Sequence, residues 1–156
     1  FYGDSAYTFP VGEIDAESAN LLKVTKESLY LGAEKAVAGN RIGDIGSTIQ
    51  QYAEKAGFSV VREMVGHGIG KNMHESPEVP NYGKPGNGKK LQDGMVICIE
   101  PMITMGSRRV IFERDGWTVR THDRKPAAHF EYAVAVGKDG PDILTDFSII
   151  EEAINN

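Results

Sequence analysis

The stretch GHGIGKNMHE at residues 66–75 places two histidines seven residues apart in a glycine-rich run. Two glutamates follow in separate apolar runs, Glu100 at the end of the run 95–99 and Glu131 within the run 129–136. Imidazole nitrogens and carboxylate oxygens are donors that many divalent ions prefer in proteins. Together the three segments predict a hydrolytic metal site, built from parts of the chain that are far apart in the sequence.

A glutamate inside a strand usually faces solvent or forms a salt bridge, so the two glutamates need a second argument. Both Glu100 and Glu131 interrupt runs of apolar residues. A carboxylate buried among apolar side chains is costly unless a partner charge or a metal ion compensates it. Because histidines are present as well, a metal-binding role is favoured for both glutamates.

Further motifs extend this pattern toward both ends of the chain. They are Gly3-Asp4-Ser5, Ile99-Glu100-Pro101-Met102, Phe130-Glu131-Tyr132, Asp139-Gly140 and Ile143-Leu144-Thr145. Taken in order with residues 66–75, these motifs resemble type I methionine aminopeptidases.

The resemblance implies a set of metal ligands. Asp4, His67, Glu100 and Glu131 correspond to one metal position of the family, and Asp4 and Glu131 also correspond to bridges to a second ion. The full-length enzyme that the resemblance implies therefore uses two divalent ions. One imidazole and three carboxylates, without a thiolate, suit Co, Mn, Fe or Zn.

The resemblance also implies residues that act on the substrate. His74 matches the family's histidine that hydrogen-bonds the scissile amide, and Glu100 matches the proposed acceptor of the attacking water's proton. Met73 and Trp117 match apolar substrate-binding positions around the methionine side chain. From the residues alone, a structural loop histidine is the favoured interpretation of His74, and Met73 and Trp117 are equally compatible with core packing.

The chain departs from the family pattern in two ways. Tyr132 stands where a histidine usually follows the glutamate, and since side chains alternate along a strand, the change affects the surroundings of the site and not a ligand. The family's second metal-binding aspartate, and a histidine that contacts substrate, lie upstream of the position of Phe1. We therefore expect residues 1–156 to form a single catalytic-domain fragment that holds at most one ion tightly and has little or no peptidase activity unless the upstream segment is supplied.

Composition argues against several other classes of protein. A net charge of −5 with scattered Lys and Arg gives no electrostatic footprint for nucleic acid. No run approaches the roughly 18 apolar residues of a membrane span. Cys98 is the only cysteine, which excludes an internal disulfide and fits the cytoplasm, and its apolar neighbours are typical of a small buried hydrophobe.

Hydrophobic periodicity predicts one α+β domain. Apolar spacing predicts helices at 15–38 and 44–57, each ended by a glycine. Little regular structure is expected at 66–94. The resemblance implies the pita-bread fold, here a truncated form with a curved antiparallel sheet, helices on its outer face and ligands on its concave face. The predicted strands are 1–9, 58–64, 95–99 and 129–136, with a hairpin that joins 109–114 to 117–121 through Asp115-Gly116.

The function that the resemblance implies is removal of N-terminal methionine from nascent proteins by metal-activated water. Methionyl peptides are the implied substrates, and the ribosome is a candidate partner. Two alternatives stay open, an X-Pro aminopeptidase or prolidase-like peptidase of the same fold and a non-catalytic binding module without metals. Ile99-Glu100-Pro101-Met102 and Asp115-Gly116-Trp117-Thr118 favour the methionine branch, and the four retained donors disfavour the module.

Overall fold

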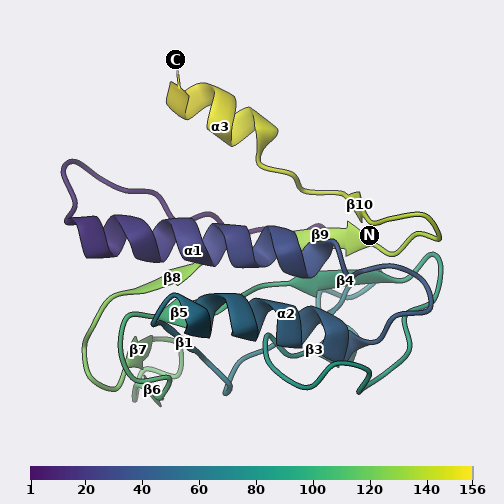
Figure 1. The fold of residues 1–156 in the computed structure, drawn as a ribbon, viewed down its shortest axis with the longest axis horizontal. Coiled ribbons are helices and arrows are strands. Elements are labelled where there is room, and N and C mark those ends of the chain that lie inside the picture. The colour runs from purple at the N-terminus through teal and green to yellow at the C-terminus, as the bar shows by residue number, and fades with distance from the viewer. Residues whose placement is uncertain (156) are drawn as a thin grey trace.

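The computed structural model describes residues 1–155, which form an antiparallel α+β structure (Figure 1). The larger sheet has five strands, a smaller sheet has three, and a separate hairpin stands beside them. In spatial order the larger sheet is β10 (Asp142–Ile143), β9 (Tyr132–Ala135), β4 (Val96–Ile99), β2 (Gly66–Gly68) and β3 (Glu75–Val79); the smaller sheet is β1 (Ser59–Val60), β5 (Met102–Thr104) and β8 (Ala127–His129); and the hairpin is β6 (Val110–Phe112) and β7 (Val119–Thr121).

Two helices, α1 (Ala16–Ala33) and α2 (Ile42–Lys55), lie together on one face of the sheets (Figure 1). Helix α1 begins as predicted at Asp15, whose carboxylate accepts a hydrogen bond of 2.8 Å from the Ser18 N–H. Helix α2 ends before Gly57, where a φ of 89° suits glycine, also as predicted. A third helix, α3 (Ser148–Asn155), was not predicted.

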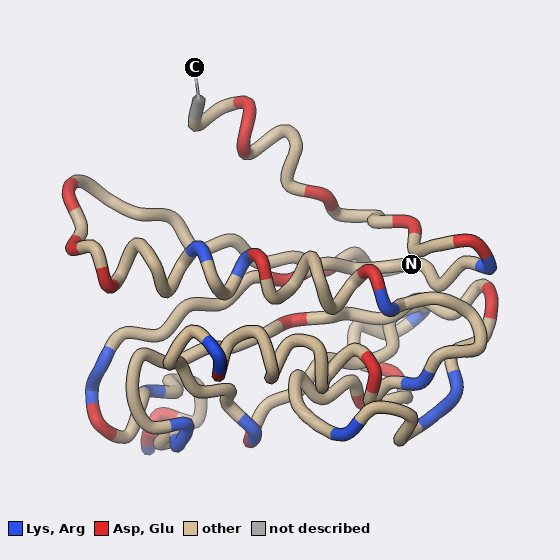
Figure 2. Tube along the Cα trace, in the orientation of Figure 1, with Lys and Arg blue, Asp and Glu red and all other residues tan. Residues whose placement is uncertain are grey.

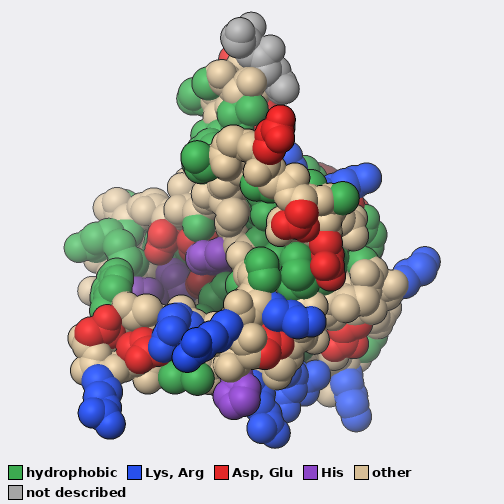
Figure 3. Space-filling model, turned by 90° about the vertical axis from the view of Figure 1, so that its left-hand side faces the viewer, with side chains coloured by type: hydrophobic (Ala, Val, Ile, Leu, Met, Phe, Trp, Pro, Cys, Tyr) green, Lys and Arg blue, Asp and Glu red, His purple; other side chains and the backbone are tan. Residues whose placement is uncertain are grey.

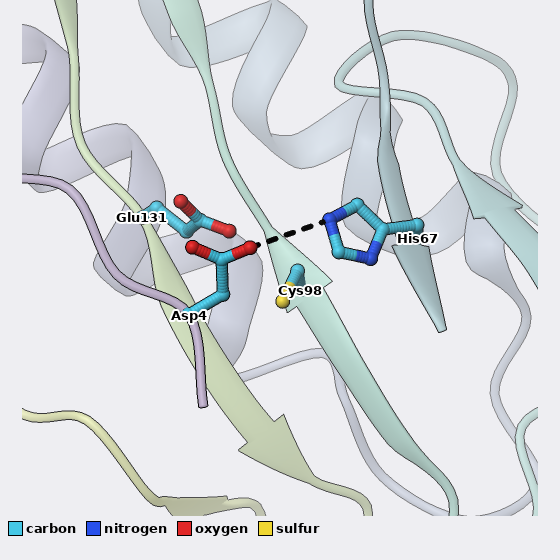
Figure 4. Close-up of side chains that lie close together, drawn as sticks. All are labelled: Asp4, His67, Cys98 and Glu131. Carbon is cyan, nitrogen blue, oxygen red and sulfur yellow. Dashed lines mark ion pairs between the residues drawn. The ribbon is translucent and has the colours of Figure 1, made fainter. Parts of the chain in front are cut away.

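The core lies between the two helices and the sheets. Side chains alternate along β4, so that Ile97 and Ile99 join the core under the helices whereas Cys98 faces the opposite side. The segment 130–133 alternates in the same way, with Phe130 and Tyr132 in the core. Glu131, between those two residues, consequently points away from the helices (Figure 4).

Each of the two predicted site glutamates lies where the chain passes from one sheet to the other. Glu100 and Pro101 separate β4 from β5, and Phe130 and Glu131 separate β8 from β9. Proline has no N–H to donate, so the ladder of β4 cannot continue through Pro101. The predicted strand 129–136 is therefore wrong as one element, because it is divided between two sheets at Glu131.

Several other predicted boundaries need correction. Residues 1–9 form no strand but only an isolated bridge between Ala6 and Glu131. The helix predicted to reach residue 38 ends at Ala33, because Val37 instead forms a parallel bridge with Gly137. The strand predicted at 58–64 is limited to β1.

The remaining differences concern turns and the glycine-rich region. Residues 66–94 are more regular than predicted, since they contain β2 and β3. Helix α2 begins at Ile42, and Asp44 accepts a hydrogen bond of 2.7 Å from the Arg41 N–H instead of starting the helix. The predicted β6–β7 hairpin is confirmed, with a φ of 73° at Gly116.

Gly66 is required by the close approach of β2 to β4. A Cβ at this position would overlap the carbonyl oxygen of Cys98, which belongs to a backbone that cannot move without breaking the sheet. We expect Gly66→Ala to lower the free energy of unfolding by about 1–3 kcal/mol. Urea unfolding checks this, with Gly140→Ala as the control because a Cβ there meets nothing within 4 Å. Equal midpoints for the two variants would contradict the packing argument.

Candidate metal centre

Four side chains from distant segments converge on the face opposite the helices (Figure 4). They are Asp4 of the N-terminal segment, His67 of β2, Cys98 of β4 and Glu131 at the β8–β9 junction. One donor atom from each of the four lies within 4.8 Å of all the others. On the face shown in Figure 3, histidine and acidic side chains gather in a hollow.

His67 stands between two carboxylates. Its Nε2 lies 3.9 Å from Asp4 Oδ2 and 3.5 Å from Glu100 Oε1. Its Nδ1 lies 2.9 Å from the Gly68 carbonyl oxygen, which can only accept a hydrogen bond, so Nδ1 carries the hydrogen. In the neutral ring this leaves the Nε2 lone pair directed at the carboxylates, which is how a ligating histidine is oriented.

Glu131 is the most buried carboxylate of the site. The residue is only 4% exposed, and its Oε1 has no hydrogen-bond partner within the described part of the chain. Burial, followed by the charges of Glu100 and Asp4, raises the pKa of Glu131 to about 7. A buried carboxylate beside two others is relieved either by a proton or by a positive charge, so the residues present fit a divalent cation.

Cys98 is buried, as predicted, but its thiol also borders the site. Burial, followed by the charge of Glu131, raises the pKa of the thiol above its ordinary value. In the metal-free protein the thiol is therefore protonated at neutral pH. The imidazole and the carboxylates that were predicted as ligands lie on the same side of the sheet as the thiol.

His129 is a site residue that sequence reasoning missed. Its Nε2 lies 3.6 Å from Glu100 Oε2, and one donor atom each from His129, Glu100 and Glu131 lie within 4.8 Å of one another. A signal for it was present, because residues two apart in an extended segment point to the same face and His129 precedes Glu131 by two.

Of the three residues predicted to contact substrate, His74 lies beside the centre, whereas Met73 and Trp117 are exposed. The His74 ring meets the His67 ring edge-on, with centroids 4.4 Å apart, so His74 lies beside the centre. Met73 precedes it and is partly exposed, whereas Trp117 lies in the turn of the β6–β7 hairpin and is 90% exposed. Neither Met73 nor Trp117 is among the residues that line the cavity beside Glu100 and His129.

Tyr132 points away from the centre, as alternation predicted. It is buried in the core, where it stacks on Tyr30 with ring centroids 5.7 Å apart and contacts Phe147 at 4.3 Å. The aromatic ring at this position therefore contributes to packing between β9, α1 and the segment before α3.

Comparison with known proteins now assigns the chain to a family. The sequence profile of metallopeptidase family M24 matches residues 1–138. The chain is a member of metallopeptidase family M24. It is similar to the methionine aminopeptidase of Clostridium acetobutylicum, with 57% identity over 145 residues, which are 93% of this chain and 58% of that protein.

Solved structures of the M24 family share the fold. The crystal structure of methionine aminopeptidase from Thermotoga maritima matches with a TM-score of 0.91 and 44% identity, over 93% of this chain and 58% of that one. The prolidase from Pyrococcus horikoshii OT3 matches with a TM-score of 0.71 and 23% identity, over 92% and 36%. The predicted pita-bread fold is confirmed, and the chain spans 58% of the length of the Clostridium and Thermotoga relatives.

Along the described part of the chain, basic and acidic residues are mixed. Figure 2 shows Lys and Arg interspersed with Asp and Glu along helices and loops, without a continuous stripe of one sign. None of the helices formed by residues 1–155 is both long enough and apolar enough to span a bilayer.

The raised pKa of Glu131 predicts how the stability of the metal-free protein changes with pH. Between about pH 4.5 and about 7 the folded state keeps a proton that the unfolded state releases, so rising pH favours unfolding. We expect chemical unfolding in EDTA to show stability falling over this window and levelling off above it.

In Glu131→Gln the part of this fall that comes from Glu131 should disappear, which makes the variant more stable than the parent at pH 8. Glu78→Gln, at an exposed position on β3, is the matched control and should follow the parent. If both variants follow the parent, Glu131 is not the group that burial penalises.

Proposed function

We propose that this chain forms the metal-binding part of a methionyl aminopeptidase, which removes N-terminal methionine from newly made proteins. The convergence of Asp4, His67, Glu100 and Glu131, in which Oε1 of the buried Glu131 has no hydrogen-bond partner among the described residues, carries the proposal. The 57% identity to a protein named methionine aminopeptidase supports the choice of substrate. The proposed place of action is the cytoplasm, where nascent chains leave the ribosome.

These four residues are the proposed ligands, and Co, Mn, Fe or Zn are the ions that suit them. Bound divalent ions polarise a carbonyl group and lower the pKa of a water molecule. The orientation of His67 is fixed by its hydrogen bond to Gly68, and Glu131 is fixed by the backbone hydrogen bond of 2.9 Å that its N–H donates to Ala6.

Two residues are proposed to handle protons and orient the peptide. Glu100 is half-buried and has one oxygen toward each of His67 and His129, so it is placed to accept a proton from the attacking water. His74 is exposed beside His67, where its ring can donate a hydrogen bond to the scissile peptide group.

An apolar cavity of about 430 Å³ adjoins the centre and offers space for a substrate side chain. Glu100 and His129 form part of its wall, and Val61, Met64 and Met102 are among its apolar lining residues. An unbranched apolar side chain such as methionine fits this lining. Met73 and Trp117 stay as further proposed contacts of that side chain.

The alternatives have weaker support. Likeness to prolidase at 23% identity shows the fold alone. A module that has lost its metals does not explain why a buried carboxylate is surrounded by two more carboxylates and an imidazole.

Hydrolysis of Met-Ala-Ser by the full-length enzyme with Mn²⁺ or Co²⁺ tests the proposed function. We expect release of methionine that stops in EDTA and in Glu100→Gln, and no release of the first residue from Lys-Ala-Ser. Cleavage of Ala-Pro peptides in preference to Met-Ala-Ser would favour the X-Pro alternative. No cleavage by a protein that binds the ions would contradict the proposal.

The predicted role of His74 separates substrate handling from metal binding. His74→Ala should lower kcat on a methionyl peptide by roughly 10²-fold, because a proton-handling group contributes about that much. Its affinity for Mn²⁺, measured by isothermal titration, should stay that of the parent. His122→Ala is the control, since His122 lies in the turn after β7. Unchanged turnover in His74→Ala would remove His74 from the mechanism.

A further inference from the structure

His129 presents a buried nitrogen that has no hydrogen-bond partner among the described residues. The Nε2 atom is inaccessible to solvent and makes no hydrogen bond within the described residues. The nearest acceptor is Glu100 Oε2 at 3.6 Å, which is longer than the 2.7–3.2 Å of an N–H···O hydrogen bond. A polar nitrogen in this state is costly unless something binds it.

The backbone holds the His129 ring in this place. The Thr8 hydroxyl donates a hydrogen bond of 2.6 Å to the His129 carbonyl oxygen, and the His129 N–H lies 3.1 Å from the same hydroxyl oxygen. On the other side, His129 pairs with Met102 in the β5–β8 ladder. The position of the ring is thus fixed by two neighbouring segments.

The carboxylates of Glu100 and Glu131 each face two groups of side chains. Glu100 directs Oε1 toward His67 and Oε2 toward His129. Glu131 belongs to both candidate groups, one with Asp4 and His67 and the other with Glu100 and His129. Its Oε1 and the His129 Nε2 are both buried without a partner.

We propose that His129 is a metal ligand, which forms with Glu100 and Glu131 a second position for a divalent ion beside the one at Asp4 and His67. One nitrogen and two carboxylates suit Mn, Fe, Co or Zn. Two donors on one ion at about 2.1 Å are at most about 4.2 Å apart, so 3.6 Å between His129 and Glu100 fits without backbone movement.

This inference revises the expectation that the chain holds at most one ion tightly. The resemblance offered only Asp4 and Glu131 for the second ion, whereas His129 adds an imidazole on the other side of Glu131. The inference rests on the metal binding of the proposed function and not on its peptidase activity.

Ring nitrogen NMR on protein labelled with ¹⁵N-histidine tests the inference directly, because the chain has only four histidines. On addition of Zn²⁺ we expect the Nε2 resonances of both His67 and His129 to move to the position of a metal-bound nitrogen. The ring of His122 should not change. Assignments come from His129→Gln, His67→Gln and His122→Gln.

Isothermal titration with Zn²⁺ supplies the stoichiometry. His129→Gln should bind one ion fewer than the parent while the His67 resonance still responds, which also shows that the variant is folded. His122→Gln should bind as many ions as the parent. If His67 Nε2 responds and His129 Nε2 does not, His129 is no ligand and the inference fails alone. If neither responds, the metal binding of the proposed function fails as well.

Discussion

The mutual repulsion of three carboxylates in a partly buried site is the constraint on which the rest of this structure depends. Asp4, Glu100 and Glu131 are brought together from three segments, and Glu131 is almost completely buried. Two like charges about 4 Å apart repel by about 4 kcal/mol at the effective dielectric constant near a protein surface. The fold tolerates this arrangement because protonation of Glu131 or a bound cation can relieve it, and a bound cation is the form that the proposed function requires.

This arrangement follows from the way the chain passes between the two sheets. The chain crosses twice from one sheet to the other, and each crossing carries a glutamate, Glu100 at one and Glu131 at the other. At the crossings the flanking residues Ile99, Phe130 and Tyr132 stay in the core under the helices. The glutamates therefore point to the opposite face, where His67 on β2 meets them.

Much of this arrangement could be predicted from the sequence. The donors His67, Glu100 and Glu131 stand out because they interrupt apolar or glycine-rich runs, and the N-cap at Asp15 and the hairpin at Gly116 follow from local turn chemistry. The division of residues 129–136 between two sheets could not be predicted, because it depends on which partner each half finds. The position of His129 two residues before Glu131 indicated a shared face, but its relation to Glu100 exists only once β5 and β8 pair.

The most direct test of the central claim is anomalous X-ray diffraction from crystals of the protein grown with saturating Mn²⁺. The account predicts an anomalous peak among the carboxylates, within bonding distance of His67 Nε2 and of oxygens of Asp4 and Glu131, about 2.0–2.3 Å from each. Crystals in which Mn²⁺ occupies only surface positions, with the three carboxylates free of any ion, would contradict it.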